Sequence, residues 1–182
     1  MWSGPRNIST ALLRSFSNRD DTFVYDEPFY SYYLKETGFD HPMRDEIIDF
    51  YPTSENEVIK TILKDKKGIY YQKHMTHHIL DKTNLEWLEK GTNCFLIRHP
   101  SKVINSYIKK NKLYSITDIG FDQMFRLFNY VKKNISKNIV IVNANTLLEN
   151  PEIYIKRLCM NLNIGFSKKM LKWPKGITKD FG

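Results

Sequence analysis

The sequence has few cysteines and no long apolar run. Only two cysteines, Cys94 and Cys159, occur among its 182 residues, and both stand in apolar surroundings. A disulfide framework is therefore not expected, and two buried reduced thiols in a cytoplasmic protein are the simpler interpretation. No stretch approaches the roughly 20 apolar residues of a membrane-spanning helix. The first ten residues also lack the apolar core of a signal peptide.

Acidic side chains are in the minority. The chain carries 20 Asp and Glu against 28 Lys and Arg, a formal net charge of +8. This excess favours anionic partners, but many lysines come in pairs such as Lys109–Lys110 and Lys132–Lys133, which are typical of a solvated helical surface. Motifs of zinc fingers, basic zippers and aromatic RNA-binding domains are absent from the sequence. We therefore expect no nucleic-acid partner.

Repeats, low-complexity stretches and linkers are also missing, so the length suits one domain, 1–182. Short β-rich segments alternate with helical ones, which predicts an α/β fold with helices on both faces of a parallel sheet. The last two expected strands are almost wholly apolar, as central parallel strands are. The four expected strands are Thr22–Tyr25, Ile69–Gln72, Cys94–Ile97 and Ile139–Val142.

Helices are expected between these strands. Ser54 and Glu57 form a capping box, and Pro151 suits the start of a helix over Glu152–Leu162. A longer helix has an apolar face made of Phe121, Met124, Phe125, Phe128 and Val131. Only Met1 and Trp2 precede the first loop. Either the first strand is nearly absent or the natural N-terminus lies upstream.

The first loop runs into an amphipathic helix and is a candidate anion site. Such a loop presents free backbone N–H groups and the positive end of a helix dipole. Arg6 adds a fixed charge, and Ser9 and Thr10 add hydroxyl donors. The spacing resembles a P-loop without its Gly-Lys-Ser/Thr ending, which disfavours an NTPase. An ordinary capped helix start explains the loop equally well. The candidate binding residues are Gly4, Pro5, Arg6, Asn7, Ile8, Ser9 and Thr10.

A second candidate anion site follows the apolar strand Cys94–Ile97. Arg98 stands at the carboxyl end of that strand, where open α/β sheets bind ligands. Ser106 and Lys110 are one helical turn apart and would share a face. Arg, Ser and Lys side chains that converge make a phosphate-binding cluster. The plainer interpretation is a surface arginine ahead of a generic helix, and for this segment alone it is favoured.

Together the two segments resemble the sulfotransferase family. The loop Gly4-Pro5-Arg6-Asn7-Ile8-Ser9-Thr10 is similar to the family's 5′-phosphosulfate loop, with Asn7-Ile8 in place of the usual Ser-Gly. Arg98-His99-Pro100 followed by Ser106 is similar to its 3′-phosphate site. The resemblance continues through Asn143–Leu171 and thus spans most of the chain. It implies a three-layer, P-loop-NTPase-like fold and the donor 3′-phosphoadenosine 5′-phosphosulfate.

The resemblance also implies catalytic residues. Glu27 follows Arg6 at the distance of the catalytic Glu in the tyrosylprotein branch. Lys73 matches a lysine near the transferring sulfuryl group, and His74 is one residue short of the histidine of the cytosolic branch. From the residues alone, Glu27 is equally a helix-start carboxylate, and His74, His77 and His78 are a partly exposed helix start. His74 and His78 have the spacing of two metal ligands but no third, so we expect no metal.

The expected activity is sulfuryl transfer to a hydroxyl or amine of an unidentified small molecule. Arg6, Glu27, Lys73 and His74 are the candidate catalytic residues, with Glu27 and His74 as alternative bases. Two other functions stay open: a P-loop kinase-like enzyme that uses ATP, and a non-catalytic nucleotide-binding protein. Family members continue after Trp173-Pro174-Lys175-Gly176 with a segment that closes the donor site, whereas this chain ends at Gly182.

Overall fold

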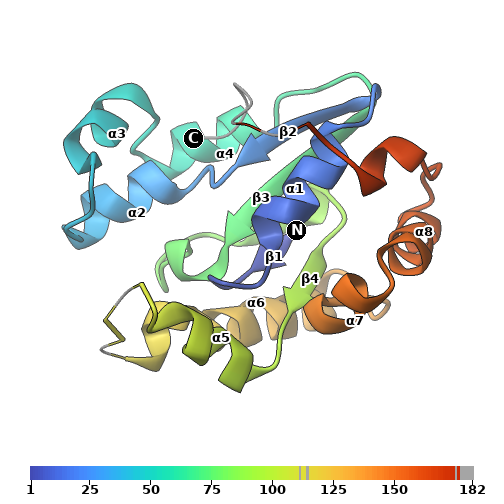
Figure 1. Cartoon of the computed structure of the whole chain (residues 1–182). Coiled ribbons are helices and arrows are strands. Elements are labelled where there is room, and N and C mark those ends of the chain that lie inside the picture. Colours follow the sequence, from blue (N-terminus) through green and yellow to red (C-terminus); the bar gives the residue numbers. More distant parts are fainter. Residues whose placement is uncertain (111, 114, 175, 177–182) are drawn as a thin grey trace.

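The sheet is parallel and its strand order is not the order of the sequence. The computed structural model describes residues 1–110, 112–113, 115–174 and 176. Within these residues five strands pair in the order β2-β3-β1-β4-β5, and all neighbours run parallel. The strands are β1 Trp2–Ser3, β2 Thr22–Asp26, β3 Ile69–Met75, β4 Cys94–Ile97 and β5 Val140–Asn143 (Figure 1).

The first strand is present, very short and central. Trp2 pairs with His74 of β3 on one side and with Phe95 of β4 on the other. Ser3 pairs in the same way with Met75 and Leu96. Both residues of β1 are buried, and Trp2 is only 2% exposed. The loop that follows β1 therefore starts from the middle of the sheet.

Two expectations about the strands are wrong. β3 runs on to Met75, so Lys73 and His74 lie inside the strand instead of following it. The apolar segment expected to be central forms the edge strand β5, where Ile141 is 51% exposed. An apolar run shows that a strand is packed, but it carries no information about which strands lie beside it.

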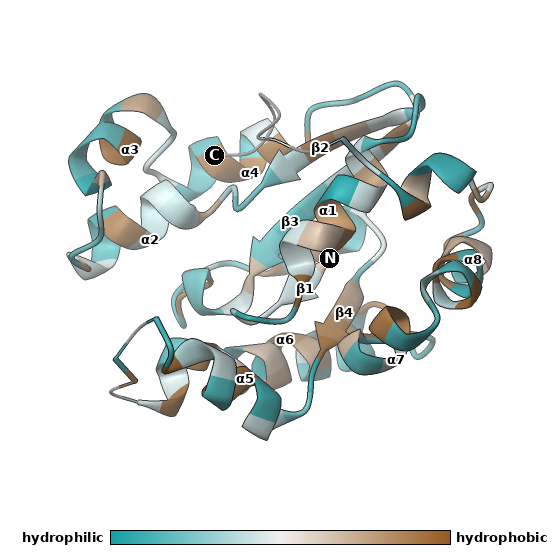
Figure 2. Ribbon diagram, in the orientation of Figure 1, coloured by the Kyte–Doolittle hydropathy of each residue, from teal (hydrophilic) through white to brown (hydrophobic). Residues whose placement is uncertain are grey.

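Helices cover both faces of the sheet, which confirms the three-layer α/β fold. On one face Leu12 and Phe16 of α1 pack with residues of α7 and α8, and on the other Val58 of α4 and Leu127 of α6 pack against Trp2 and Phe95. Figure 1 shows α1 lying over one face and α6 on the far side. The hydropathy colouring of Figure 2 marks β4 between them as strongly apolar. The α-helices are α1 Ser9–Ser17, α2 Tyr30–Thr37, α3 Arg44–Phe50, α4 Glu55–Ile62, α5 Pro100–Tyr107, α6 Phe121–Asn134, α7 Ala144–Glu149 and α8 Pro151–Asn161; the short 3-10 helices are η1 Thr76–His78, η2 Glu86–Lys90, η3 Ile116–Ile119 and η4 Lys168–Leu171.

The helix predictions hold in outline. The Ser54 side chain caps α4 by accepting from the Glu57 N–H, and α8 begins at Pro151 as its sequence indicates. On α6 the buried face includes Leu127, whereas Phe125, expected in the core, is 69% exposed. Among the described residues no helix is both long and apolar enough to cross a membrane. Of the expected C-terminal segment, residues 175 and 177–182 lie outside the described part.

Candidate active site

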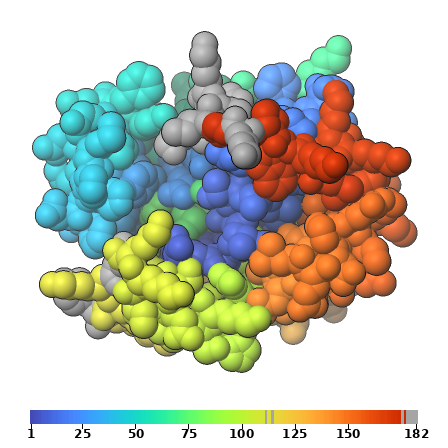
Figure 3. Space-filling view, viewed as in Figure 1, coloured from blue at the N-terminus to red at the C-terminus, as the bar shows by residue number. Residues whose placement is uncertain are grey.

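The carboxyl ends of the parallel strands bring the candidate residues to one edge of the sheet. The first loop follows β1, Glu27 follows β2, η1 follows β3 and Arg98 follows β4. The strand order changes direction at β1: the chain forms β2 and β3 on one side of it and then β4 and β5 on the other. Open α/β sheets bind their ligands outside such a switch point. Figure 3 shows the N-terminal segment in a recess between the α2–α3 region and the chain around α5.

The loop after β1 has an unusual backbone. Arg6 and Ile8 adopt left-handed conformations, with φ of 61° and 60°. Non-glycine residues rarely adopt this conformation, and it is found most often where surrounding contacts hold it at a functional site. Those contacts are present, because Asn7 Nδ2 donates to the Leu96 carbonyl at 3.2 Å and Gly4 packs against Ile119. A Cβ on Gly4 would lie 2.7 Å from the Ile119 carbonyl oxygen, so only glycine fits there.

The structure brings the two predicted anion sites together. Arg6 Nε donates to Ser106 Oγ at 3.0 Å, and Arg98 Nη1 donates to the Arg6 carbonyl at 2.8 Å. Within the described part of the chain, neither guanidinium forms an ion pair with a carboxylate. Helix α1 begins at Ser9 in the same loop and has no acidic residue in its first turn. Two uncompensated cations beside a helix N-terminus suit a phosphate-bearing ligand.

The other polar residues of these two segments are less favourably placed to bind a phosphate. Ser9 is buried, while Thr10 is exposed on the first turn of α1. Helix α5 ends at Tyr107, so Lys110 lies beyond it and does not share a helical face with Ser106. The expectation of that shared face is wrong because the helix stops before it completes the turn from Ser106 to Lys110.

A buried lysine holds two carboxylates at the ends of β2 and β3. Lys73 Nζ lies 2.6 Å from Asp26 Oδ1 and 2.8 Å from Glu27 Oε1, and the lysine side chain is 3% exposed. Burial alone would lower the pKa of Lys73, but the carboxylates of Glu27 and Asp26 raise it above its ordinary value. Burial raises the pKa of Asp26, against the lowering effect of Lys73. Glu27 has a φ of 45°, so the backbone is also strained where its carboxylate meets the lysine.

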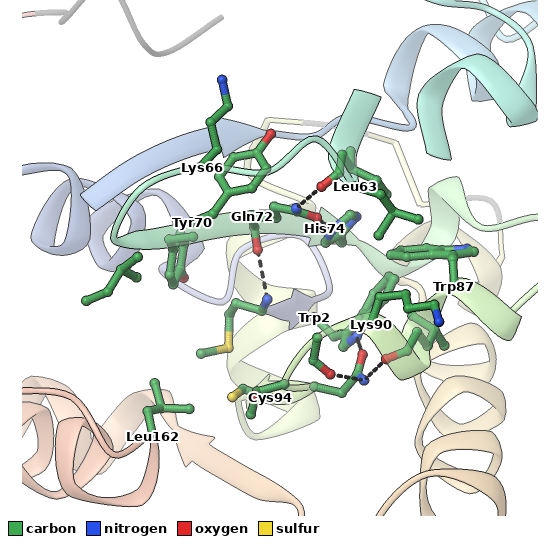
Figure 4. A pocket seen from close by; sticks show the side chains of 18 of the residues that line it. Trp2, Leu63, Lys66, Tyr70, Gln72, His74, Trp87, Lys90, Cys94 and Leu162 are labelled. Atoms are coloured by element: carbon green, nitrogen blue, oxygen red, sulfur yellow. Dashed lines mark hydrogen bonds between the residues drawn. The ribbon is translucent and has the colours of Figure 1, made fainter. Parts of the chain in front are cut away.

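His74 points away from this ion-pair cluster. Neighbouring residues of a strand face opposite sides of the sheet, and His74 stacks on Trp2 with ring centroids 4.6 Å apart. Its Nε2 lies 3.1 Å from Gln72 Oε1, and burial lowers its pKa well below the ordinary value. It lines a cavity of about 560 Å³ together with Trp87 and the first residues of the strands (Figure 4). That cavity is at the amino edge of the sheet, opposite the loop.

His78 is the histidine that lies beside Glu27. Its Nδ1 is 4.0 Å from Glu27 Oε2, and its ring is stacked between those of Tyr30 and Tyr33, each with centroids 4.9 Å away. Burial lowers the pKa of His78 well below its ordinary value and that of His77 to about 4. The expectation of a partly exposed helix start is wrong for His74 and His78, which are buried. The available signal in the sequence was the pair of aromatic residues Tyr30 and Tyr33, three and six residues after Glu27.

A second contact missed by sequence reasoning ties η1 to the start of α6. Thr76 Oγ1 donates to the Gly120 carbonyl at 2.8 Å, and Thr76 is fully buried. Gly120 has a φ of 68°, and a Cβ there would lie 2.5 Å from Thr76 Oγ1. Because Ile119 also packs on Gly4, this junction supports both the loop and the end of β3.

The family profile described as "Sulfotransferase domain" matches residues 1–181. The chain belongs to the sulfotransferase family. This match confirms the resemblance to that family. Among solved structures, the "Sulfotransferase Domain from the Curacin Biosynthetic Pathway" matches this sulfotransferase-family chain with a TM-score of 0.62 and 16% identity. The match covers 97% of this chain and 77% of that one, and at this identity it shows the shared fold.

Two curated Arabidopsis thaliana proteins match this sulfotransferase-family chain over its whole length. "Branched-chain-amino-acid aminotransferase-like protein 1" and "Branched-chain-amino-acid aminotransferase-like protein 2" are each 33% identical over 183 residues. The alignments cover 100% of this chain but only 33% and 32% of the plant proteins. The chain thus spans about a third of the length of these relatives, and their printed names describe proteins that are much longer.

Proposed function

We propose that this chain transfers a sulfuryl group from 3′-phosphoadenosine 5′-phosphosulfate to a hydroxyl or amine of a small acceptor. Membership of the sulfotransferase family supports the reaction type. The observation that carries the choice of donor is the cluster of Arg6, Ser106 and Arg98, which is contributed by two segments about a hundred residues apart. A donor with phosphates at both its 3′ and 5′ positions needs two cationic positions, and this cluster offers two guanidinium groups.

The donor would be held by its phosphates. In this proposal the backbone N–H groups at the start of α1 and the Arg6 guanidinium bind the 5′-phosphosulfate. Arg98 and Ser106 bind the 3′-phosphate and so select this nucleotide over ATP. Arg98 Nε is buried without a partner among the described residues, which leaves a donor group available for a ligand. Gly4, Pro5, Asn7, Ile8, Ser9, Thr10 and Lys110 complete the proposed donor site.

The transfer itself would use the ion-pair cluster. The acceptor oxygen or nitrogen attacks the sulfur in line, its bond to sulfur forms, and the bond from sulfur to the 5′-phosphate oxygen breaks. Glu27 accepts the acceptor's proton, and Lys73 neutralises charge on the sulfuryl oxygens. Arg6 stabilises the negative charge that grows on the departing phosphate, as cations do in phosphoryl transfer. These positively charged groups and the backbone donors stabilise the negative charge of the transition state, so the proposal requires no metal.

Between the two candidate bases we favour Glu27. Its carboxylate lies against Lys73, whereas the His74 ring is packed among aromatic side chains on the opposite face of the sheet. We therefore assign His74 to the core and His78 to the support of Glu27. A positioning role for His78 follows from its 4.0 Å separation from the Glu27 carboxylate and from its confinement by two tyrosine rings.

Ligand-induced stabilisation tests the proposal directly. A ligand that binds only the native state raises the melting temperature. We expect 3′-phosphoadenosine 5′-phosphate, the desulfated donor, to raise it without metal and to do so more than AMP or ATP with Mg²⁺. If ATP with Mg²⁺ stabilises the protein more and EDTA abolishes the effect, a kinase-like function replaces this proposal. If the desulfated donor binds but no acceptor is sulfated, the chain is a nucleotide-binding member without catalysis.

The Arg6→Ala variant separates binding from catalysis. Charge on the leaving phosphate is greatest in the transition state, so the variant should lose more in kcat than in affinity for the desulfated donor. Lys102→Ala is a suitable control, because Lys102 is an exposed cation on α5. Turnover that survives in Arg6→Ala would contradict the role given to the loop.

A further inference from the structure

A small cavity adjoins the candidate base. It has a volume of about 170 Å³, and Glu27 lies in its wall together with Tyr25, Tyr30, Ile47 and Tyr51. Asp26, Pro28 and Ser31 complete the wall, which is thus mostly aromatic and aliphatic, with two carboxylates that are neighbours in sequence. It is separate from the larger cavity at the amino edge of the sheet, which Glu27 does not line. Any molecule held here would present one end to Glu27 and its body to the tyrosines.

Helix α3 supplies the outer wall of this cavity. Ile47 belongs to α3 and Tyr51 caps its C-terminus. None of the α3 residues is buried, and the helix contacts α2 without entering either core cluster. The Ser31 hydroxyl of α2 is the link, at 3.3 Å from both the Ile47 and the Tyr51 carbonyl oxygens. The wall is therefore attached to the rim of the domain and is not part of its core.

The volume limits what the cavity can hold. An engineered apolar cavity of about 150 Å³ in another protein holds one benzene molecule. At about 170 Å³ this cavity is close to that size, which suits a single six-membered ring and a small substituent better than two fused rings. Aromatic side chains pack well against flat rings through stacked or edge-to-face contacts. Three of the lining residues are tyrosines, which favours a flat ring as the occupant.

We infer that this cavity is the acceptor site, that it takes a compact molecule built on one ring, and that Ile47 and Tyr51 set the size limit. The inference rests on the proposed function, because it takes Glu27 as the group that receives the acceptor's proton. The ring lies among the tyrosines, and its hydroxyl or amine group points to Glu27. Polycyclic acceptors and polymer chains are excluded by the wall that α3 provides.

The test compares one-ring and two-ring acceptors on the same protein. Binding is measured by calorimetry on protein saturated with 3′-phosphoadenosine 5′-phosphate, and sulfate transfer is measured with the intact donor. The probes are phenol and 2-naphthol, with benzylamine and 1-naphthylmethylamine as the amine pair. The variants are Ile47→Ala and Tyr51→Ala. The matched control is Ile48→Ala, which removes the same atoms from the same helix at a residue outside the cavity wall.

Wild-type protein should bind and sulfate the one-ring probe of a pair and discriminate against its two-ring partner. Ile47→Ala or Tyr51→Ala should shift that preference toward the two-ring probe by about tenfold or more, since a few buried carbons change selectivity by 10–200-fold. Ile48→Ala should leave it unchanged. Because α3 has no buried residue, all three variants should remain folded.

The possible failures are distinct from one another. Equal acceptance of one-ring and two-ring probes by the wild type, or the same preference in every variant, would overturn the inference. So would the absence of any probe binding while the desulfated donor still binds, and in that case the proposed function would stand. Failure of the desulfated donor itself to bind would remove the proposed function and this inference with it.

Discussion

Replacing Lys73 by methionine should lower the stability of the protein, and this effect can be measured without a substrate. Methionine keeps a long apolar stem and removes the ammonium group that contacts both Asp26 and Glu27. The two carboxylates, 13% and 30% exposed, are then left beside each other without a cation. Removing one partner of a buried ion pair costs about 3–5 kcal/mol. Because Glu27 is partly exposed, we expect a loss near the lower limit, about 3 kcal/mol at neutral pH.

The loss should depend on pH in a defined direction. Burial already raises the pKa of Asp26, and without Lys73 that pKa rises further. A carboxyl group with a raised folded-state pKa favours folding when it is protonated, so its contribution is present at low pH and is lost as the pH rises through that pKa. The loss of stability relative to the wild type should therefore be largest at pH 7.5 and smaller at pH 4.5. The raised pKa of Lys73 keeps the wild-type lysine charged at both values.

Urea unfolding at the two pH values measures this difference as a change in the free energy of unfolding. Lys35→Met is the control, because the Lys35 ammonium contacts only Thr53 Oγ1 on the surface among the described residues and should change stability by less than about 0.5 kcal/mol. Adding Asp26→Asn to Lys73→Met should recover part of the loss at pH 7.5. A loss below about 1 kcal/mol, or an equal loss at both pH values, would refute the argument from buried charge.

Three further outcomes can be measured. Arg98→Ala should weaken binding of 3′-phosphoadenosine 5′-phosphate about tenfold or more and leave AMP binding unchanged in calorimetry; an equal loss for both would make Arg98 a support for the loop. Glu27→Gln should lower turnover by about 10²–10⁴-fold, and His74→Asn should lower it less; the reverse order would give the proton to His74. Gly120→Ala should destabilise the protein by about 1–3 kcal/mol more than Gly38→Ala in urea unfolding. Both glycines have a positive φ, of 68° and 64°, but of the two only Gly120 would place a Cβ within 4 Å of another atom. Equal losses of stability would therefore mean that Thr76 moves away from the new Cβ at no measurable cost.

Some elements of the fold can be predicted from sequence because their signals are local. Cys94–Ile97 is an uninterrupted apolar segment followed by Arg-His-Pro, and the structure places β4 over the same four residues. Pro151 marks the start of α8, because a proline at that position loses no helical hydrogen bond. The position of β5 at the edge of the sheet is different. It depends on pairing between distant strands, and nothing within Val140–Asn143 records it.

The candidate site also has some features that the sequence predicts and others that depend on tertiary pairing. Arg98 follows an apolar strand in the sequence, so its place at the carboxyl edge of a parallel sheet can be predicted from strand-end geometry. The strand before Arg6 is only two residues long and is not evident in the sequence, so the contact of Arg6 with Ser106 could be expected only through the resemblance to the family. The environment of His74 cannot be predicted in this way. It depends on whether β3 ends at Gln72 or at Met75, and a shift of one residue in a strand exchanges the two faces. Strand ends are set by tertiary pairing, here with Trp2 and Ser3 of β1.

The two-residue central strand also constrains the order in which this protein can assemble during synthesis. β1 is translated before β2 to β5, yet its partners in β3 and β4, His74–Met75 and Phe95–Leu96, are made much later. β2 and β3 can pair with each other as soon as Met75 is available, whereas the loop around Arg6 gains its Leu96 and Ser106 contacts only after β4 and α5 have followed. The loop that we propose to bind the donor therefore lacks its contacts with Leu96 and Ser106 until more than half of residues 1–182 have been translated.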